Sequence, residues 1–227
     1  MDIRSSVRRL IGRPTPMERA FTTVFHANTW QCEESRSGMG STIARTATIR
    51  AELPALLARL EAQSLLDAAC GDFNWMRLLT LPVARYVGVD VVRPLIRQNR
   101  RRHAAPGRAF HVADITADRL PRCDAVLCRD CLIHLSFADI ARALRNLRSS
   151  GARTLIATNH PMLATHADIA SGGFRTVNLH LPPFDLPAPQ LRVIENETAG
   201  KTLDVWPFAM LPPLDLASEA VAGDRAL

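Results

Sequence analysis

The chain has few aromatic residues, almost no lysine and no long apolar run. Phe, Trp and Tyr make up 5% of its 227 residues, which argues against stacking platforms for nucleic-acid bases. No apolar run approaches the roughly 20 residues of a membrane-spanning helix, and no secretory signal is visible. Lys201 is the only lysine, so the net charge of +6 comes almost entirely from arginine. These absences predict a protein that neither spans a membrane nor stacks on bases.

The arginines gather in two clusters, at residues 4–13 and 97–102. The second cluster ends a predicted helix over residues 94–103, where cations meet the negative end of the helix dipole. We interpret it as a solvated helix end, with a phosphate-binding patch as the alternative. The first cluster either contacts a partner or forms an amphipathic cap.

Cysteine is scarce as well. Five cysteines, at positions 32, 70, 123, 128 and 131, make an odd number without the spacing of a disulfide framework. We therefore expect a reducing, cytoplasmic location.

The hydrophobic pattern alternates between strands and helices. Apolar runs predict five strands, at residues 64–69, 86–90, 109–113, 123–128 and 153–158. Helices are predicted near residues 74–80, 94–103 and 137–149, between most of these strands. Two more strands flank residues 196–200 and predict a C-terminal antiparallel hairpin. The fold class is therefore α/β, with a doubly wound, mostly parallel sheet and helices on both faces.

One turn carries the strongest functional signal. The apolar run at residues 65–69 ends in an acidic turn around Gly71, and a second apolar run ends in Asp90 about twenty residues later. A missing side chain at Gly71 lets a ligand approach the backbone, and the Asp90 carboxylate suits ribose hydroxyls. A dinucleotide site needs GxGxxG, whereas this turn has one glycine. Asp67 and Asp72 would repel a pyrophosphate but suit a ligand with ammonium and sulfonium groups, which disfavours an NAD-dependent enzyme.

These residues resemble motif I of the class I methyltransferases that depend on S-adenosyl-L-methionine (SAM). That motif commonly reads Asp/Glu-x-Gly-x-Gly-x-Gly, and Ala69 and Phe73 replace its first and third glycines here. HisValAlaAspIle, residues 111–115, resembles the segment whose acidic residue meets adenine, and residues 123–130 resemble the fourth strand and its exit loop. The resemblance implies a Rossmann-like fold with SAM as cofactor. The implied cofactor contacts are Asp67, Ala69, Gly71, Asp72, Trp75, Asp90, Val91, Asp114, Ile115, Arg129, Trp30, Ser37 and Gly38.

The segment before this core is the second informative region. Residues 25–41 resemble the segment with a Trp and a SerGlyxGlySer motif in a group of small bacterial methyltransferases. This resemblance implies a lid over the cofactor with Trp30 as a wall; a plain linker before a helix over residues 42–61 is the alternative. Arg45 either meets the cofactor carboxylate or is simply exposed. We expect residues 1–63 to form this helical extension and lid, and residues 64–227 to form the core.

Catalysis should lie after the fourth and fifth strands, where open α/β sheets bind ligands. Neutral His134 is the candidate general base, with Asp130 orienting the imidazole or the substrate. A structural role or a cofactor contact is the alternative for His134. Cys128, Cys131 and His134 have the spacing of zinc ligands but lack a fourth partner. Oxygen ligands do not cluster around Asp130 and His160 as magnesium requires, so we expect no metal.

Substrate specificity is expected from residues 159–190, which carry little predicted secondary structure. The candidate substrate contacts are Asn159, His160, Asn178, His180 and Phe184. The function predicted from the sequence is methyl transfer to a small molecule, with an oxygen of a sugar or secondary metabolite favoured and nitrogen possible. A nucleic-acid or protein methyltransferase and a non-catalytic partner protein with this fold are the alternatives.

Overall fold

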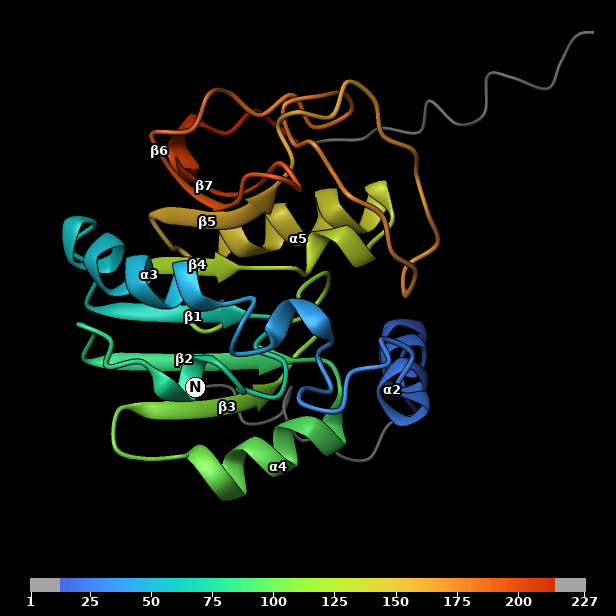
Figure 1. Ribbon diagram of the computed structural model, residues 1–227, viewed down its shortest axis with the longest axis vertical. Helices are drawn as coiled ribbons and strands as arrows, with labels where there is room; N and C mark the ends of the chain where they lie inside the picture. The colour runs from blue at the N-terminus through green and yellow to red at the C-terminus, as the bar shows by residue number, and fades with distance from the viewer. Residues whose placement is uncertain (1–12, 215–227) are drawn as a thin grey trace, which may run out of the picture.

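Seven strands form a single sheet in the order β3-β2-β1-β4-β5-β7-β6 (Figure 1). The computed structural model describes residues 13–214, so most of the first arginine cluster lies outside it. Strands β1 to β5 run parallel, and β7 pairs antiparallel with both β5 and β6. This topology confirms the predicted α/β, Rossmann-like fold with its C-terminal hairpin. The strands are β1 (Ser64–Ala68), β2 (Arg85–Asp90), β3 (Arg108–Val112), β4 (Ala125–Cys128), β5 (Thr154–Asn159), β6 (Leu191–Asn196) and β7 (Lys201–Pro207).

The helices cover both faces because successive strand residues point to opposite sides of a sheet. In β1, Leu65 packs into the core cluster that contains residues of α3 (Ala47–Arg59) and α4 (Arg93–His103). Leu66, the next residue, packs into the cluster that contains residues of α5 (Phe137–Ser149). The sheet therefore lies between two apolar layers.

Local capping explains where two of the helices begin. Thr15 precedes α2 (Pro16–Ala27) and accepts a hydrogen bond from the backbone of Glu18 at 3.1 Å. Ser136 precedes α5 and accepts one from the backbone of Asp139 at 3.2 Å, as its sequence predicts. No helix of the described residues is long and apolar enough to cross a bilayer.

The predicted helix near residues 74–80 is wrong. The connection between β1 and β2 holds only a 3₁₀ turn, η2 (Met76–Leu78). The reason lies just before it, where the side chain of Asn74 donates to Glu34 at 2.8 Å and to the carbonyl of Ser41 at 3.1 Å. The loop is thus held by contacts with the N-terminal segment rather than by helical hydrogen bonds. The helix predicted at residues 42–61 is shorter, since α3 begins at Ala47.

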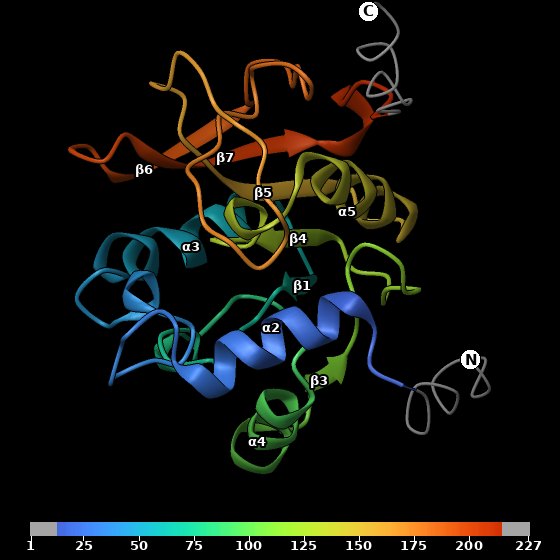
Figure 2. The same cartoon turned by 90° about the vertical axis from the view of Figure 1, so that its right-hand side faces the viewer.

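Helix α2 determines where a ligand can reach the sheet. It lies across the carboxyl ends of the parallel strands (Figures 1 and 2). These ends are where open α/β sheets bind their ligands.

Candidate active site

A cavity opens between the carboxyl ends of the parallel strands, α2 and the segment at residues 30–41. It encloses about 1020 Å³, its open mouth included. Four carboxylates line it because parallel strands end at one edge of the sheet. Asp67 belongs to β1, Asp90 ends β2, and Asp114 and Asp130 each stand two residues beyond β3 and β4. The three acidic positions predicted for the cofactor thus meet in one cavity.

Backbone groups orient two of these carboxylates. Asp90 accepts hydrogen bonds from the backbone N–H of Gly71 at 3.2 Å and of Val92 at 2.9 Å. Asp114 accepts from the backbone and the hydroxyl of Thr116, at 2.9 and 2.6 Å. Burial raises the pKa of Asp90 to about 6. Neither side chain is free to turn away from the cavity without losing these bonds.

Asp67 is the most deeply buried of the four cavity carboxylates. Its carboxylate accepts a hydrogen bond from the Tyr86 hydroxyl at 2.5 Å. Burial raises the pKa of Asp67 to about 7, although this hydrogen bond opposes the shift. A cation bound nearby would favour the ionised form.

The N-terminal segment is fastened to the motif I turn by Asp72. The Asp72 carboxylate accepts from the Ser35 hydroxyl at 3.0 Å and from the backbone of Arg36 at 2.7 Å. The Asp72 backbone N–H donates to the hydroxyl of Ser37 at 2.9 Å. A Cβ atom on Gly71 would lie 2.2 Å from that hydroxyl, so only glycine fits this turn. Ser37 lines the cavity, whereas Asp72 and Gly38 lie behind the lining.

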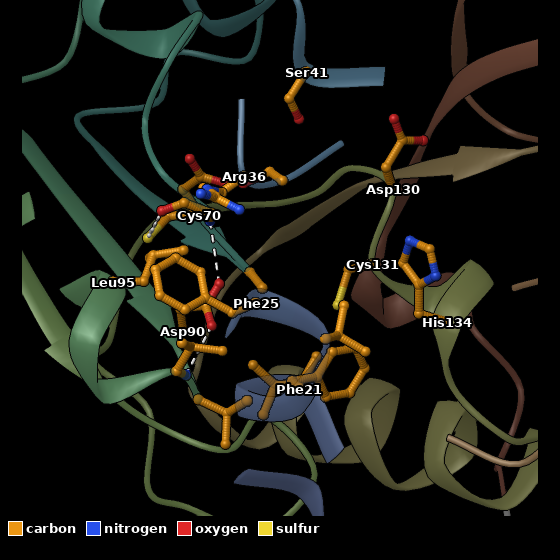
Figure 3. Close-up of a pocket in the computed structure, with 18 of the residues that line it drawn as sticks. Phe21, Phe25, Arg36, Ser41, Cys70, Asp90, Leu95, Asp130, Cys131 and His134 are labelled. Carbon is orange, nitrogen blue, oxygen red and sulfur yellow. Dashed lines mark hydrogen bonds between the residues drawn. The ribbon is translucent and has the colours of Figure 1, made fainter. Parts of the chain in front are cut away.

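His134 faces the cavity as a neutral imidazole of defined tautomer. Its Nδ1 lies 2.8 Å from the carbonyl oxygen of Gly173. Because a carbonyl only accepts, Nδ1 carries the proton and Nε2 keeps its lone pair. Burial lowers the pKa of His134. Its ring lies 4.5 Å from the Trp30 ring between centroids, and Figure 3 shows it on the cavity wall near Asp130.

Gly173, not Asp130, holds the imidazole of His134, so of the two roles expected for Asp130 only that of orienting the substrate stays a prediction. Asp130 instead binds Lys201, whose Nζ lies 2.6 Å from Oδ2, and Arg129, 3.1 Å from the same oxygen. The Thr158 hydroxyl donates to its other oxygen at 3.2 Å. Although burial alone would raise the pKa of Asp130, the two cations hold it below its ordinary range. Asp130 is therefore an ionised carboxylate with a partner on each oxygen.

Arg129 extends this network to the segment at residues 30–41 and to the hairpin. Its guanidinium pairs with Glu195 of β6 and donates to the carbonyl of Gly40 at 2.8 Å. It also lies 5.3 Å from the centre of the Trp75 ring. The Nζ atom of Lys201 lies 3.2 Å from Oε1 of the same Glu195. The charges of two cations and two carboxylates therefore balance. We call Arg129, Asp130, Glu195 and Lys201 the ion cluster.

A family model for a methyltransferase domain matches residues 65–151, from β1 through α5. Over these residues the chain is similar to a methyltransferase domain. The cavity carboxylates Asp67, Asp90 and Asp114, and His134, all belong to the matched residues of this domain. A comparison with curated proteins finds no match.

Three solved methyltransferase structures are similar to this chain, and the first of them shares its fold. Phosphoethanolamine N-methyltransferase 1 of Haemonchus contortus, solved with phosphoethanolamine and S-adenosylhomocysteine, is 13% identical, with a TM-score of 0.51 over 71% of this chain and 36% of its own. Magnesium protoporphyrin IX methyltransferase from Synechocystis PCC 6803, with bound SAM, is 16% identical, with a TM-score of 0.49 over 69% of this chain and 82% of its own. CalS10, an amino pentose methyltransferase from Micromonospora echinaspora, is 22% identical, with a TM-score of 0.43 over 59% of this chain and 55% of its own.

Eleven of the thirteen predicted cofactor residues line the cavity of the methyltransferase domain. They are Trp30, Ser37, Asp67, Ala69, Gly71, Trp75, Asp90, Val91, Asp114, Ile115 and Arg129. The five predicted substrate residues, Asn159, His160, Asn178, His180 and Phe184, do not. Asn178 shows why: its amide donates to the carbonyls of Pro161 and Leu163, at 3.3 and 2.9 Å. Polar side chains in this segment satisfy its own backbone, and Phe184 packs in the core.

The contribution of α2 to the cavity was not predicted from the sequence. Met17, Phe21, Val24 and Phe25 all line it. Their spacing of i, i+4, i+7 and i+8 is that of one helix face and was available as a signal. Arg36, Ser41 and Cys131 also line the cavity, whereas Arg45 is exposed elsewhere. Within residues 13–214, no three His, Cys, Asp or Glu side chains are grouped to hold a metal ion.

Proposed function

We propose that the protein binds SAM in this cavity and transfers its methyl group to an oxygen of a small-molecule acceptor, with His134 as the general base. The observation that carries the proposal is the meeting of Asp67, Asp90 and Asp114 with a neutral, oriented His134 in one cavity. These groups fit SAM, because its cationic groups suit carboxylates and its hydroxyl and amino groups need acceptors. When bound, SAM supplies an electrophilic methyl group.

Each of these residues would contact a different part of the cofactor or the acceptor. Asp90 would accept from the ribose hydroxyls, Asp114 from the adenine amino group, and Asp67 would face the cationic methionine end. Nε2 of His134 would take the proton of the acceptor hydroxyl, while the carbonyl of Gly173 holds Nδ1–H. The same base would serve an amine acceptor, so nitrogen remains the second choice of atom.

We also propose that the segment at residues 30–41 is the lid, and that residues 1–63 are an extension of a core formed by residues 64–227. Two contacts support this division. The segment at residues 30–41 is hydrogen-bonded to Asp72, and the Arg129 guanidinium donates to the carbonyl of Gly40. The likeness of residues 25–41 to the small bacterial group belongs to the same proposal. Because α2 and the lid cover the sheet edge, a small acceptor is favoured over a nucleic acid or a protein.

Calorimetric titration tests the cofactor directly. Wild type, Asp90→Asn and the exposed control Asp185→Asn are titrated with SAM, S-adenosylhomocysteine and NAD. We expect wild type and the control to bind the first two ligands and not NAD. Asp90→Asn should bind them at least tenfold more weakly, because a buried acceptor becomes a donor. A folded wild type that binds neither sulfur nucleoside contradicts the proposal and supports a non-catalytic partner protein.

A further inference from the structure

The cavity has two chemically different ends. Figure 3 shows Asp90, Phe25 and Leu95 on one side, and Phe21, Cys131 and His134 on the other. Under the proposed function, the Asp90 end holds the cofactor ribose. The acceptor must then reach the end that contains the base, so the side chains around His134 decide what kind of molecule enters.

The surroundings of His134 are mostly apolar. Trp30, Phe21, Cys131 and Leu135 line this end, and Met17 of α2 lies in the same lining. Leu135 is buried, and Phe21 packs against both core clusters. None of these side chains except the Trp30 indole can form a conventional hydrogen bond to a ring of hydroxyl groups.

The Asp130 carboxylate at this end is already bound by protein groups. Both oxygens of Asp130 are engaged, one by Lys201 and Arg129 and the other by the Thr158 hydroxyl. The polar lid residues Arg36 and Ser41 lie across the cavity from Phe21 (Figure 3). A sugar packed against Phe21 would bury hydroxyls without partners, which is unfavourable.

An exposed aromatic ring stands beside the base. The ring of Phe174 lies 5.7 Å from that of His134, and 60% of the residue is exposed. It follows Gly173, whose carbonyl fixes the imidazole. Phe174 does not itself line the cavity, but its exposed ring adjoins the imidazole that does. The rings of Trp30 and Phe174 thus both lie close to the imidazole.

We infer that the acceptor is an apolar molecule with an aromatic hydroxyl group, whose ring packs against Phe21, Trp30 and Phe174 and whose hydroxyl meets Nε2 of His134. This inference rests on the proposed function. In the transfer, the methyl carbon leaves sulfur for the phenolic oxygen, and the phenolic proton goes to His134 and then to water. Burial lowers the pKa of His134, and such a weak base suits an acidic phenol better than a sugar hydroxyl.

The test uses the complex with S-adenosylhomocysteine and two probes, 2-naphthol and methyl glucoside. We expect 2-naphthol to bind, followed by its fluorescence, and methyl glucoside not to bind in a competition titration. Phe174→Ala should weaken 2-naphthol binding about tenfold and leave the nucleoside affinity unchanged. The side chain of Phe174 is exposed, so its removal should not disturb folding. Phe21→Ala should act in the same way, whereas Phe25→Ala should weaken the nucleoside instead.

The outcomes separate this inference from the proposed function. If S-adenosylhomocysteine does not bind wild type, the proposed function itself fails. If it binds but 2-naphthol does not, or methyl glucoside binds more tightly, only the acceptor class is overturned. Equal affinity of 2-naphthol for wild type, Phe174→Ala and Phe21→Ala also overturns it, because binding would then lie elsewhere.

Discussion

His134 is the residue on which the proposed chemistry depends, because it brings a neutral nitrogen to the cavity. His134→Gln should lower the rate of methyl transfer by about 10²–10⁴-fold, the usual contribution of a general base. The affinity for SAM should stay within about twofold, since the amide keeps a polar side chain of similar size. His111→Gln, an exposed histidine of β3, is the matched control. A variant that loses SAM affinity and rate together would indicate a cofactor contact instead.

The same residue sets an expected pH dependence. The base must be neutral, so the rate should rise with pH as His134 loses its proton and then level off. Because burial lowers the pKa of His134, the midpoint should lie below 6.5, the ordinary value for histidine. A kcat profile between pH 4.5 and 8 measures this, and the His134→Gln profile should lack the rise. A midpoint above 6.5 would argue against His134 as the base.

Single residues also show what a sequence can predict about a site. Asp67, Asp90 and Asp114 were predictable because each adjoins an apolar run, and parallel strands bring their carboxyl ends together. The partners of His134 and Asp130 were not. Gly173 stands 39 residues from His134, and Lys201 stands 71 residues from Asp130. Such pairs depend on the path of the whole chain and leave no local pattern.

At the scale of elements, strands were easier to predict than connections. The five parallel strands were predicted within two residues at each end, since buried strands are short apolar runs. The β1–β2 connection was mispredicted because contacts with the distant residues Glu34 and Ser41 compete with helix formation. In residues 159–190 the amides of Asn159 and Asn178 suggested a ligand, yet they satisfy backbone and side-chain groups.

The lid should depend on the carboxylate that fastens it. Asp72→Asn replaces one acceptor oxygen by a donor that faces the backbone N–H of Arg36 or the hydroxyl of Ser35. We expect SAM binding to weaken about tenfold and hydrogen exchange to accelerate across residues 30–41. Asp185→Asn, on an exposed turn, should change neither. Unchanged exchange in Asp72→Asn would show that other contacts hold the segment.

The ion cluster joins the β4 exit loop to β6 and β7. Lys201→Met leaves Asp130 and Glu195 with a single buried cation, and a buried charge without its partner is costly. The free energy of unfolding should fall by about 3–5 kcal/mol, measured by urea denaturation. Arg153→Met removes a cation that is 66% exposed in its side chain and 3.6 Å from Asp124. Arg153→Met should lower the free energy of unfolding by less than about 1 kcal/mol. Equal losses in the two variants would contradict the cluster's role.

The whole molecule combines a regular sheet with an edge crowded by carboxylates. The sheet and its two apolar layers could be predicted from periodicity alone. The form of the cavity could not, because it requires α2 and the segment at residues 30–41 to meet at that edge. This arrangement buries acidic groups near one another in the unliganded protein, so the binding site should be less stable than the sheet that carries it.

The free-energy cost of burying acidic groups in the cavity should be measurable through the titration of Asp67. Its pKa is about 7 in the folded protein and 3.8 ordinarily, because burial favours the protonated form. The folded state thus holds a proton that the unfolded state has released, and the free energy of unfolding falls as pH rises through this window. Asp67→Asn cannot titrate, so between pH 5 and 8 its stability relative to wild type should grow by about 2–3 kcal/mol, the part of the window that lies above pH 5. Histidines titrate in both proteins and cancel. Urea denaturation of both proteins at pH 5 and 8 measures the difference, and a difference independent of pH would mean that Asp67 stays ionised in the empty cavity.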